Sequence, residues 1–246
     1  MQIVKREGAS VKQLVIIRLI AIMAAIIVSS VFIVFLGYDP IRVYINIISG
    51  ALGSNIRFRS TLLEMVPLVI TSLGILVAFK MKFWNIGGEG QILMGAFAAT
   101  YIALFADWVP KYLVLPVMFI VGFIAGGLWG LIPAFFKAKF GANETIMTLM
   151  LNYIATQWVT YLQYGPWRDP NLKGFAKIAN FPDHALLPKL FGIHIGFYLS
   201  LILVAVISWF LRKTKRGFEI AVVGESVSTA RYAGMEISRI IITTML

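Results

Sequence analysis

The sequence contains no cysteine and little charge: only 13% of its 246 residues are Asp, Glu, Lys or Arg, whereas 59% are hydrophobic. The lack of cysteine excludes disulfide bridges, thiolate metal sites and a cysteine nucleophile. The shortage of charged residues leaves too little polar surface to cover a soluble globule. The composition therefore predicts that most of the chain lies in lipid.

Several catalytic patterns are also missing. No phosphate-binding loop of the form GxxxxGK[ST] occurs, and no Ser-His-Asp, histidine-cluster or paired-carboxylate arrangement falls at membrane depth. His184 and His194 do not have the spacing of a metal motif. We therefore expect no enzyme activity, no metal and no cofactor, and we expect any ATPase to be another subunit.

Long apolar runs decide the fold class. In lipid the backbone polar groups must be paired within the chain, so crossing elements are helices or closed barrels, and these runs are too long for barrel strands. We predict an all-α, polytopic membrane protein, with one transmembrane domain over residues 1–246. A further apolar run starts at Ile237 and stops at Leu246, which we interpret as a truncation inside a seventh helix. The six complete spans are predicted at about 19–36, 62–79, 91–106, 112–134, 145–163 and 195–211.

The basic residues predict the topology. A net charge of +11 would suit a nucleic-acid binder, but the basic residues flank apolar runs instead of sharing one face. With the N-terminus in the cytoplasm, 14 of the 22 basic residues lie inside and eight outside, as the positive-inside rule requires. This topology makes 37–61 and 164–194 extracellular loops and makes 214–235 cytoplasmic.

Small residues recur at helical spacing in two of the predicted spans. Gly122, Gly126 and Gly130 are four residues apart, and Gly95 begins a similar pattern with two alanines. Such faces let helix backbones approach closely where no hydrophobic driving force separates helix from lipid. We predict that they are helix-packing surfaces.

A polar stripe runs along the fifth predicted span, because its members recur every three or four residues. The stripe either holds helices together or lines a path for a polar, uncharged solute, and the pattern leaves both open. Asn152, near its middle, is the strongest candidate for solute contact, because its amide offers both donors and acceptors. The stripe consists of Thr145, Thr148, Asn152, Thr156, Thr160 and Gln163.

Segment 80–91 interrupts two apolar runs with three glycines and a carboxylate. Glycine permits irregular backbone, which at membrane depth often marks a transport site. Asn85, Glu89 and Gln91 are therefore candidates for the solute path. The alternative is a cytoplasmic turn in which Glu89 complements the dipole of the next helix.

Segment 214–235 follows a basic cluster and is amphipathic, with apolar residues spaced for a short helix on either side of Gly224. A short helix on the cytoplasmic face can insert into a groove of a partner and transmit its motion, although an ordinary surface helix has the same pattern. The candidate coupling residues are Phe218, Glu219, Gly224, Glu225 and Arg231.

Three stretches resemble the permease family of bacterial simple-sugar and nucleoside ABC importers. Residues 83–91 (FWNIGGEGQ) are similar to the family's F-N-I-G-x-E-G-Q signature, from which Trp84 departs. Residues 141–155 (GANETIMTLMLNYIA) are similar to its G-A-N-E and M-L-N-Y-I-A segment. Residues 214–234 resemble its coupling segment, with Ser226 and Val227 where Asn-Pro is common.

This resemblance implies a nucleoside permease in the bacterial cytoplasmic membrane, with a ribose-type sugar permease as the alternative. It also implies three kinds of partner: a second permease subunit, an ATP-binding subunit and an extracytoplasmic lipoprotein that delivers the solute. A different class, the ion-coupled secondary transporters, usually places ionisable residues inside the bundle. Here only Glu64 and Glu89 qualify, and both lie near the ends of predicted helices.

Overall fold

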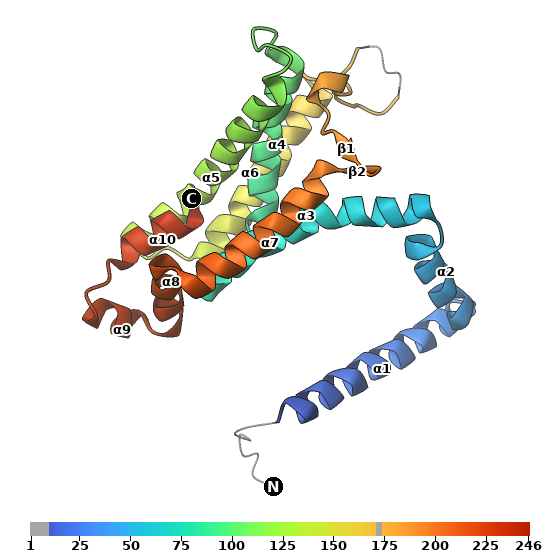
Figure 1. The fold of residues 1–246 in the computed structure, drawn as a ribbon, viewed down its shortest axis with the longest axis horizontal. Coiled ribbons are helices and arrows are strands. Elements are labelled where there is room, and N and C mark those ends of the chain that lie inside the picture. The colour runs from blue at the N-terminus through green and yellow to red at the C-terminus, as the bar shows by residue number, and fades with distance from the viewer. Residues whose placement is uncertain (1–9, 171–173) are drawn as a thin grey trace. The chain divides into compact units, whose positions relative to one another are not determined.

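The computed structural model describes residues 10–170 and 174–246, and Figure 1 shows that they are built almost entirely of helices. The prediction of an all-α fold is confirmed in this part of the chain. The described residues form two compact units, with the boundary between Thr61 and Leu62.

The first unit contains α1 (Val11–Phe35), α2 (Pro40–Leu52) and the start of α3 (Asn55–Lys80). The Asp39 side chain accepts a hydrogen bond from the Ile41 N–H at 2.9 Å, and Pro40 occupies the first position of α2, as expected for a helix start. The segment 37–61, predicted as an extracellular loop, therefore contains a helix and the start of another, while its place outside the membrane stays a prediction. Its apolar run is too short for a membrane span, but its cap and its proline start a shorter helix.

The second unit contains the rest of α3, then α4 (Gly88–Phe105), α5 (Val114–Phe140), α6 (Glu144–Tyr164) and α7 (Ile195–Lys213). The helix α4 contacts both α5 and α6, and Figure 1 shows these three helices grouped together. Between α6 and α7 lie a short 3-10 helix, η1 (Asp183–Ala185), and an antiparallel hairpin of β1 (Lys189–Leu190) and β2 (Ile193–His194).

Glycines set the distance between α4 and α5. A Cβ atom added to Gly95 would lie 3.0 Å from the Gly122 carbonyl oxygen, and one added to Gly122 would lie 3.2 Å from the Gly95 carbonyl oxygen. A Cβ atom on Gly126 would lie 3.1 Å from the Gln91 carbonyl oxygen, and one on Gly130 would overlap the Gln91 side chain. The two backbones therefore touch along this seam, as small residues allow in membrane helices.

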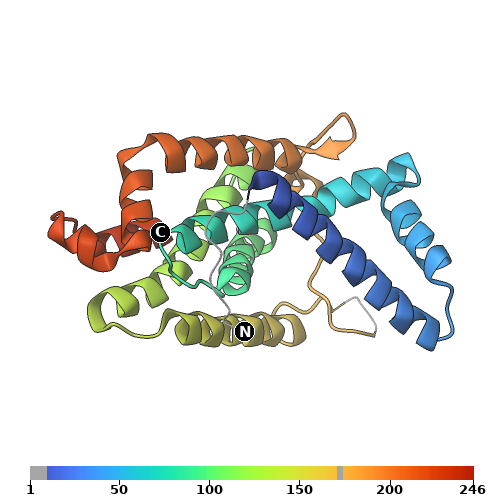
Figure 2. The same ribbon diagram turned by 90° about the horizontal axis from the view of Figure 1, so that it is seen from below.

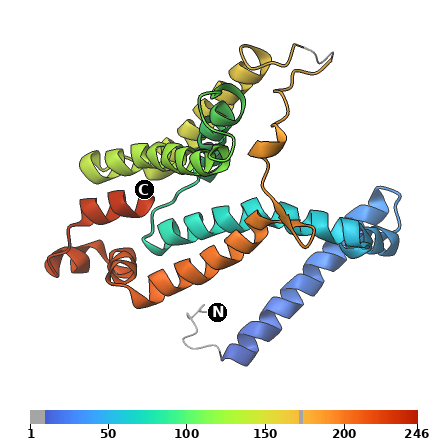
Figure 3. The ribbon, with the colours of Figure 1, turned by 45° about the horizontal axis from the view of Figure 1, so that its top comes forward.

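Three short helices follow α7: α8 (Lys215–Glu225), α9 (Val227–Tyr232) and α10 (Ile237–Met245). The extended backbone of Thr214 turns α8 away from α7 (Figure 2), and α10 lies along α5 (Figure 3). The break between α8 and α9 falls at Ser226, whose side chain accepts from the Thr229 N–H. The expected short helices on either side of Gly224 are therefore wrong in their boundary, because a serine cap and not the glycine makes the break.

Four helices, α1, α3, α5 and α7, are long and apolar enough to cross a membrane within the described residues, so the chain is a multi-pass membrane protein. The helices α4 and α6 are less apolar because they carry more polar side chains, of which Gln91, Thr148 and Asn152 bind other parts of the protein. Six complete spans and the start of a seventh remain a prediction.

The α4–α5 seam predicts a loss of stability for Gly122→Leu. The added side chain has no room beside Gly95, and we expect the free energy of unfolding to fall by about 1–3 kcal/mol, as in overpacked cores. Thermal unfolding in detergent measures this. Gly50→Ala is the control, because nothing lies within 4 Å of its added Cβ atom. Equal melting of Gly122→Leu and wild type would contradict the close contact.

Candidate functional site

One face of α6 carries three buried polar residues. Glu144, Thr148 and Asn152 are spaced four apart, and only 9%, 1% and 8% of their surfaces are exposed. The helix begins where it does because the Asn143 side chain accepts from the Thr145 N–H at 3.0 Å, directly after Gly141 ends α5 with a positive φ of 66°. This face turns toward segment 83–90, which connects α3 to α4.

The three side chains hold the backbone of that segment. Asn152 Nδ2 donates to the Ile86 carbonyl oxygen at 2.8 Å, and Asn152 Oδ1 accepts from the Gly90 N–H at 2.8 Å. Thr148 Oγ1 accepts from the Ile86 N–H at 3.3 Å, and the Glu144 carboxylate interacts with the Trp84 N–H. The side chains of α6 thus satisfy backbone groups that lack helical partners, which is a requirement away from water.

The first turn of α4 closes on the same segment. Asn85 Nδ2 donates to Gln91 Oε1 at 3.0 Å, Asn85 Oδ1 accepts from the Gly87 N–H at 2.9 Å, and Gln91 Nε2 donates to the Gly126 carbonyl oxygen at 3.3 Å. A Cβ atom on Gly90 would lie 2.7 Å from Asn152 Oδ1 and 3.0 Å from Trp129 Nε1. That indole nitrogen is the one buried side-chain polar atom without a partner among the described residues.

The structure thus brings together four of the predicted solute-path residues: Asn85, Gln91, Thr148 and Asn152. Glu89 is exposed in the first turn of α4, where a carboxylate complements the helix dipole. Thr156 is also exposed, and its hydroxyl donates to the Asn152 carbonyl oxygen at 2.9 Å. Both atoms of the Asn152 amide are occupied, which supports the packing interpretation of the stripe at this position.

Sequence reasoning did not single out Glu144 as a functional residue. It precedes Thr148 by four positions, so extending the polar stripe by one turn toward the N-terminus would have found it. Glu144 also forms an ion pair with Lys137 at 2.7 Å, which links the end of α5 to the start of α6.

A cavity of about 630 Å³ lies between α3, α4, α5 and α10. Its wall includes Gly95, Gly122 and Gly126 of the α4–α5 seam, while Asn85 and Gln91 supply amide groups. Thr71 and Thr244 add hydroxyl groups, and none of the described lining residues is charged. Thr148 and Asn152 do not line the cavity, because they hold the segment that does.

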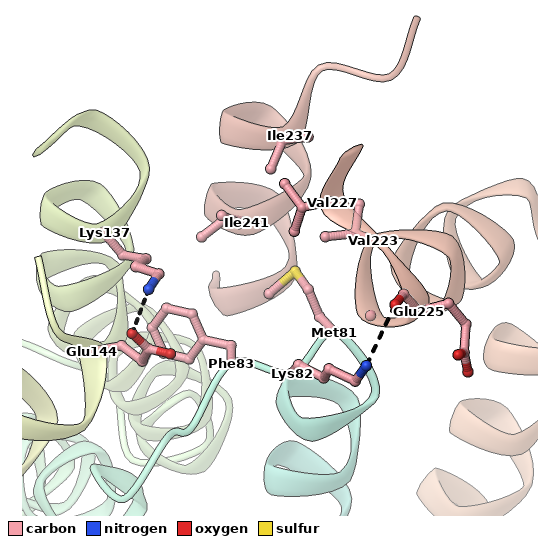
Figure 4. Close-up of a pocket in the computed structure, with 11 residues that line it drawn as sticks. Met81, Lys82, Phe83, Lys137, Glu144, Val223, Glu225, Val227, Ile237 and Ile241 are labelled. Atoms are coloured by element: carbon pink, nitrogen blue, oxygen red, sulfur yellow. Dashed lines mark hydrogen bonds and ion pairs between the residues drawn. The ribbon is translucent and has the colours of Figure 1, made fainter. Parts of the chain in front are cut away.

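A second pocket, of about 230 Å³, lies beside α8 (Figure 4). Gly224 faces the end of α3, and a Cβ atom there would overlap the Lys80 carbonyl oxygen. Lys82 Nζ donates to the Glu225 carbonyl oxygen at 3.5 Å, and the Lys137–Glu144 ion pair lies on the opposite side of the pocket. Segment 80–91 therefore contacts α8 at one end and borders the larger cavity at the other.

The other predicted coupling residues are more accessible. Phe218, Glu225 and Arg231 are exposed on α8 and α9, whereas Glu219 is half-buried. The Glu219 carboxylate accepts from Arg216 Nη1 at 3.1 Å. An exposed phenylalanine on a short polar helix is available for contact with another chain.

Comparison with known proteins decides the family. A family model described as the branched-chain amino acid transport system permease component matches residues 57–246. The chain belongs to this permease family. The prediction carried by the three motifs is confirmed, as is the prediction that the chain is a transport component and not an enzyme.

Relatives of this permease carry more specific names. It is 33% identical to a glucose ABC transporter permease of Haloferax volcanii, over 88% of this chain and 60% of the relative. It is 33% identical to a guanosine ABC transporter permease of Bacillus subtilis, over 93% and 66%, and 31% identical to a nucleoside ABC transporter permease of Lactococcus lactis, over 94% and 66%. Each organism holds a second matching permease, at 25–30% identity.

The permease chain thus spans 60–66% of the length of these curated relatives. No solved structure matches it.

The two hydrogen bonds of the Asn152 side chain predict the effect of Asn152→Leu. Leucine leaves the Ile86 carbonyl and the Gly90 N–H unpaired, and each buried unpaired group costs on the order of 1–3 kcal/mol. We expect both thermal stability and solute uptake to fall. Thr156→Val, one turn further along α6 and exposed, should leave both nearly unchanged. Loss of uptake at undiminished stability would instead indicate that Asn152 contacts the solute.

Proposed function

We propose that this chain is a permease subunit of an ABC importer and forms part of the path by which nucleosides cross the bacterial cytoplasmic membrane. The observation that carries the proposal is the family match over residues 57–246, which includes the clamped segment 83–90 and both pockets. A simple sugar is the second candidate solute, because one relative is named for glucose.

The cavity supports a polar, uncharged solute. An amino acid would bring a carboxylate and an ammonium group into the membrane, where unpaired charge is costly. The described lining residues offer no charged partner, whereas Asn85, Gln91, Thr71 and Thr244 offer amides and hydroxyls that can pair with the hydroxyls of a ribose or hexose. The glycine and alanine residues of the wall leave room for the solute ring. Nucleosides and sugars therefore suit this cavity better than branched-chain amino acids.

The proposed assembly contains a second permease subunit, an ATP-binding subunit and an extracytoplasmic substrate-binding lipoprotein. Two observations support it: the relatives are named as ABC transporter permeases, and three organisms each hold two matching permeases. A pair of different permease subunits is therefore the form that we propose. We also propose a topology for this chain. The N-terminus lies in the cytoplasm, residues 164–194 lie outside, and the chain crosses the membrane six times and begins a seventh span.

Reconstitution in vesicles tests this function. With the second permease, the ATPase and the binding lipoprotein present, we expect uptake of guanosine that requires ATP and resists ionophores. Gln91→Leu should reduce uptake about tenfold, because one hydrogen bond to the solute contributes on the order of 1 kcal/mol and the Asn85 amide loses its partner. Tyr153→Phe, on an exposed position of α6 outside the cavity, is the control. Uptake driven by an ion gradient without ATP would favour a secondary transporter, and glucose uptake would favour the sugar alternative.

We also propose that α8 and α9 form the element that docks on the ATPase. Transport requires ATP binding on one chain to move helices on another, so some contact must carry that motion. Gly224 lies directly against Lys80, so α8 rests on the chain segment that leads to Asn85. Phe218, Glu225 and Arg231 remain exposed for a partner, and Glu219 is held by Arg216.

Phe218→Ala tests the docking surface separately from the internal contact. We expect it to weaken ATPase association and lower solute-stimulated ATP hydrolysis about tenfold, as for a buried aromatic anchor at an interface. A cysteine at Ser226 should crosslink to the ATPase. Gly224→Trp should also uncouple transport, but by displacing α8 from Lys80. Unchanged hydrolysis in Phe218→Ala, together with no crosslink from Ser226→Cys, would refute this assignment.

A further inference from the structure

The helix α2 carries an apolar stripe that no other described part of the first unit covers. Ile41, Ile45, Ile48 and Leu52 follow one another at spacings of four, three and four, so they share one face, and 57–70% of each is exposed. A groove of about 300 Å³ runs along this stripe between Ile45 and Gly53. The adjacent strip of the helix is polar and contains Arg42, Asn46 and Ser49. The helix is therefore amphipathic.

A different side of α2 is fixed to its neighbours by hydrogen bonds. The Tyr44 hydroxyl lies 2.8 Å from the Ser29 hydroxyl and donates to the Ile26 carbonyl oxygen at 3.0 Å, which joins α2 to α1. Arg57 Nη1 donates to the Ser49 carbonyl oxygen at 3.0 Å, and Thr61 Oγ1 donates to the Ala51 carbonyl oxygen at 2.8 Å. The first two turns of α3 thus cap the last carbonyl groups of α2, and the stripe has a fixed orientation on this unit.

The length of α2 decides where it can lie. Its 13 residues extend about 20 Å at 1.5 Å per residue, whereas the hydrocarbon core is about 30 Å thick. The helices on either side of it, α1 and α3, are both long and apolar enough to cross that core. A helix that joins the ends of two crossing helices and is too short to cross lies at a membrane face.

We propose that α2 is an interfacial helix that docks on the phospholipid surface. Its apolar stripe enters the boundary between headgroups and acyl chains, and Arg42 and Asn46 remain at headgroup level. Amphipathic helices of this kind insert their apolar face about 5–10 Å below the surface. Lipid is the occupant because α1, to which α2 is bonded, is itself long and apolar enough to cross a membrane and is not buried by other described parts of the first unit. Arg42, whose side chain is 85% exposed, is long enough to reach phosphate groups.

This inference assigns a role to the part of the chain that precedes the family match at residue 57. A helix held at the surface by lipid and bonded to Arg57 and Thr61 fixes the depth at which α3 enters the bilayer. In the topology proposed above, that surface is the outer one. The inference depends on the membrane character of the chain and not on the solute that it transports.

Single cysteines test the position of α2, because the natural chain contains none to remove. The full chain carries Ile45→Cys or Ile48→Cys on the stripe, or Asn46→Cys on the polar strip, each labelled with an environment-sensitive fluorophore in phosphatidylcholine vesicles. Phosphatidylcholine brominated at shallow or deep acyl positions reports contact with lipid, and iodide reports contact with water. We expect shallow bromines to quench the labels at 45 and 48 severalfold more than the label at 46, and iodide to show the opposite order.

Each other result overturns the proposal in a distinct way. Equal iodide quenching at 45, 46 and 48 would mean that the stripe faces water. Protection of 45 and 48 from both quenchers would mean that protein covers the stripe, as in contact with a second copy of this chain. Stronger quenching by deep bromines than by shallow ones would mean that α2 is buried within the hydrocarbon core. None of these outcomes bears on ATP-driven uptake, so failure here is distinguishable from failure of the proposed function.

Discussion

The backbone pairing demanded by a water-poor interior is the constraint on which the functional region depends. Residues 83–87 leave the helical conformation, so some of their N–H and C=O groups, those of Ile86 among them, lack helical partners. Asn152 and Thr148 supply the missing partners for Ile86 and Gly90 from the facing helix. On α6, the side chains of Thr148 and Asn152 thus replace water for another segment, which accounts for part of its polar character. Without them, backbone groups of the irregular segment beside the cavity would be left unpaired.

The same constraint accounts for the glycines around the cavity. An amide that reaches a backbone N–H needs close approach, and Gly90 provides it because a Cβ atom there would collide with Asn152 Oδ1. Close approach of α4 to α5 through Gly95 and Gly122 brings Gln91 within reach of the Gly126 carbonyl. A cavity wall built this way consists of small residues and a few orienting amides. Shape and hydrogen bonding, and not charge, are then what the wall offers a solute.

Particular residues show how much of the fold and of the site is predictable from sequence. Long apolar runs predict the membrane class and the three motifs predict the permease family, because each of these signals lies in one continuous stretch of sequence. The helix α2 was missed because its 13 residues fall below the length of a span, and its start depends on a cap at Asp39. The sequence predicts a helix break at Gly224, because glycine often breaks helices. In the structure the break lies at Ser226, and Gly224 instead permits close packing against Lys80. The partners of Asn152 lie 62 and 66 residues away, and helical periodicity carries no information about contacts of that range.

Segment 80–91 borders both pockets, so its backbone connects them directly. At one end Gly224 presses α8 against the Lys80 carbonyl, and at the other Asn85 and Gln91 border the cavity. Between them the buried Phe83 and the Glu144 carboxylate near Trp84 restrain the chain, and Lys137 restrains Glu144 in turn. A segment restrained along its length transmits a displacement, whereas a flexible loop absorbs it. The polar face of α6 thus satisfies the irregular backbone and, through the same hydrogen bonds, holds in place the segment that runs from α8 to the cavity wall.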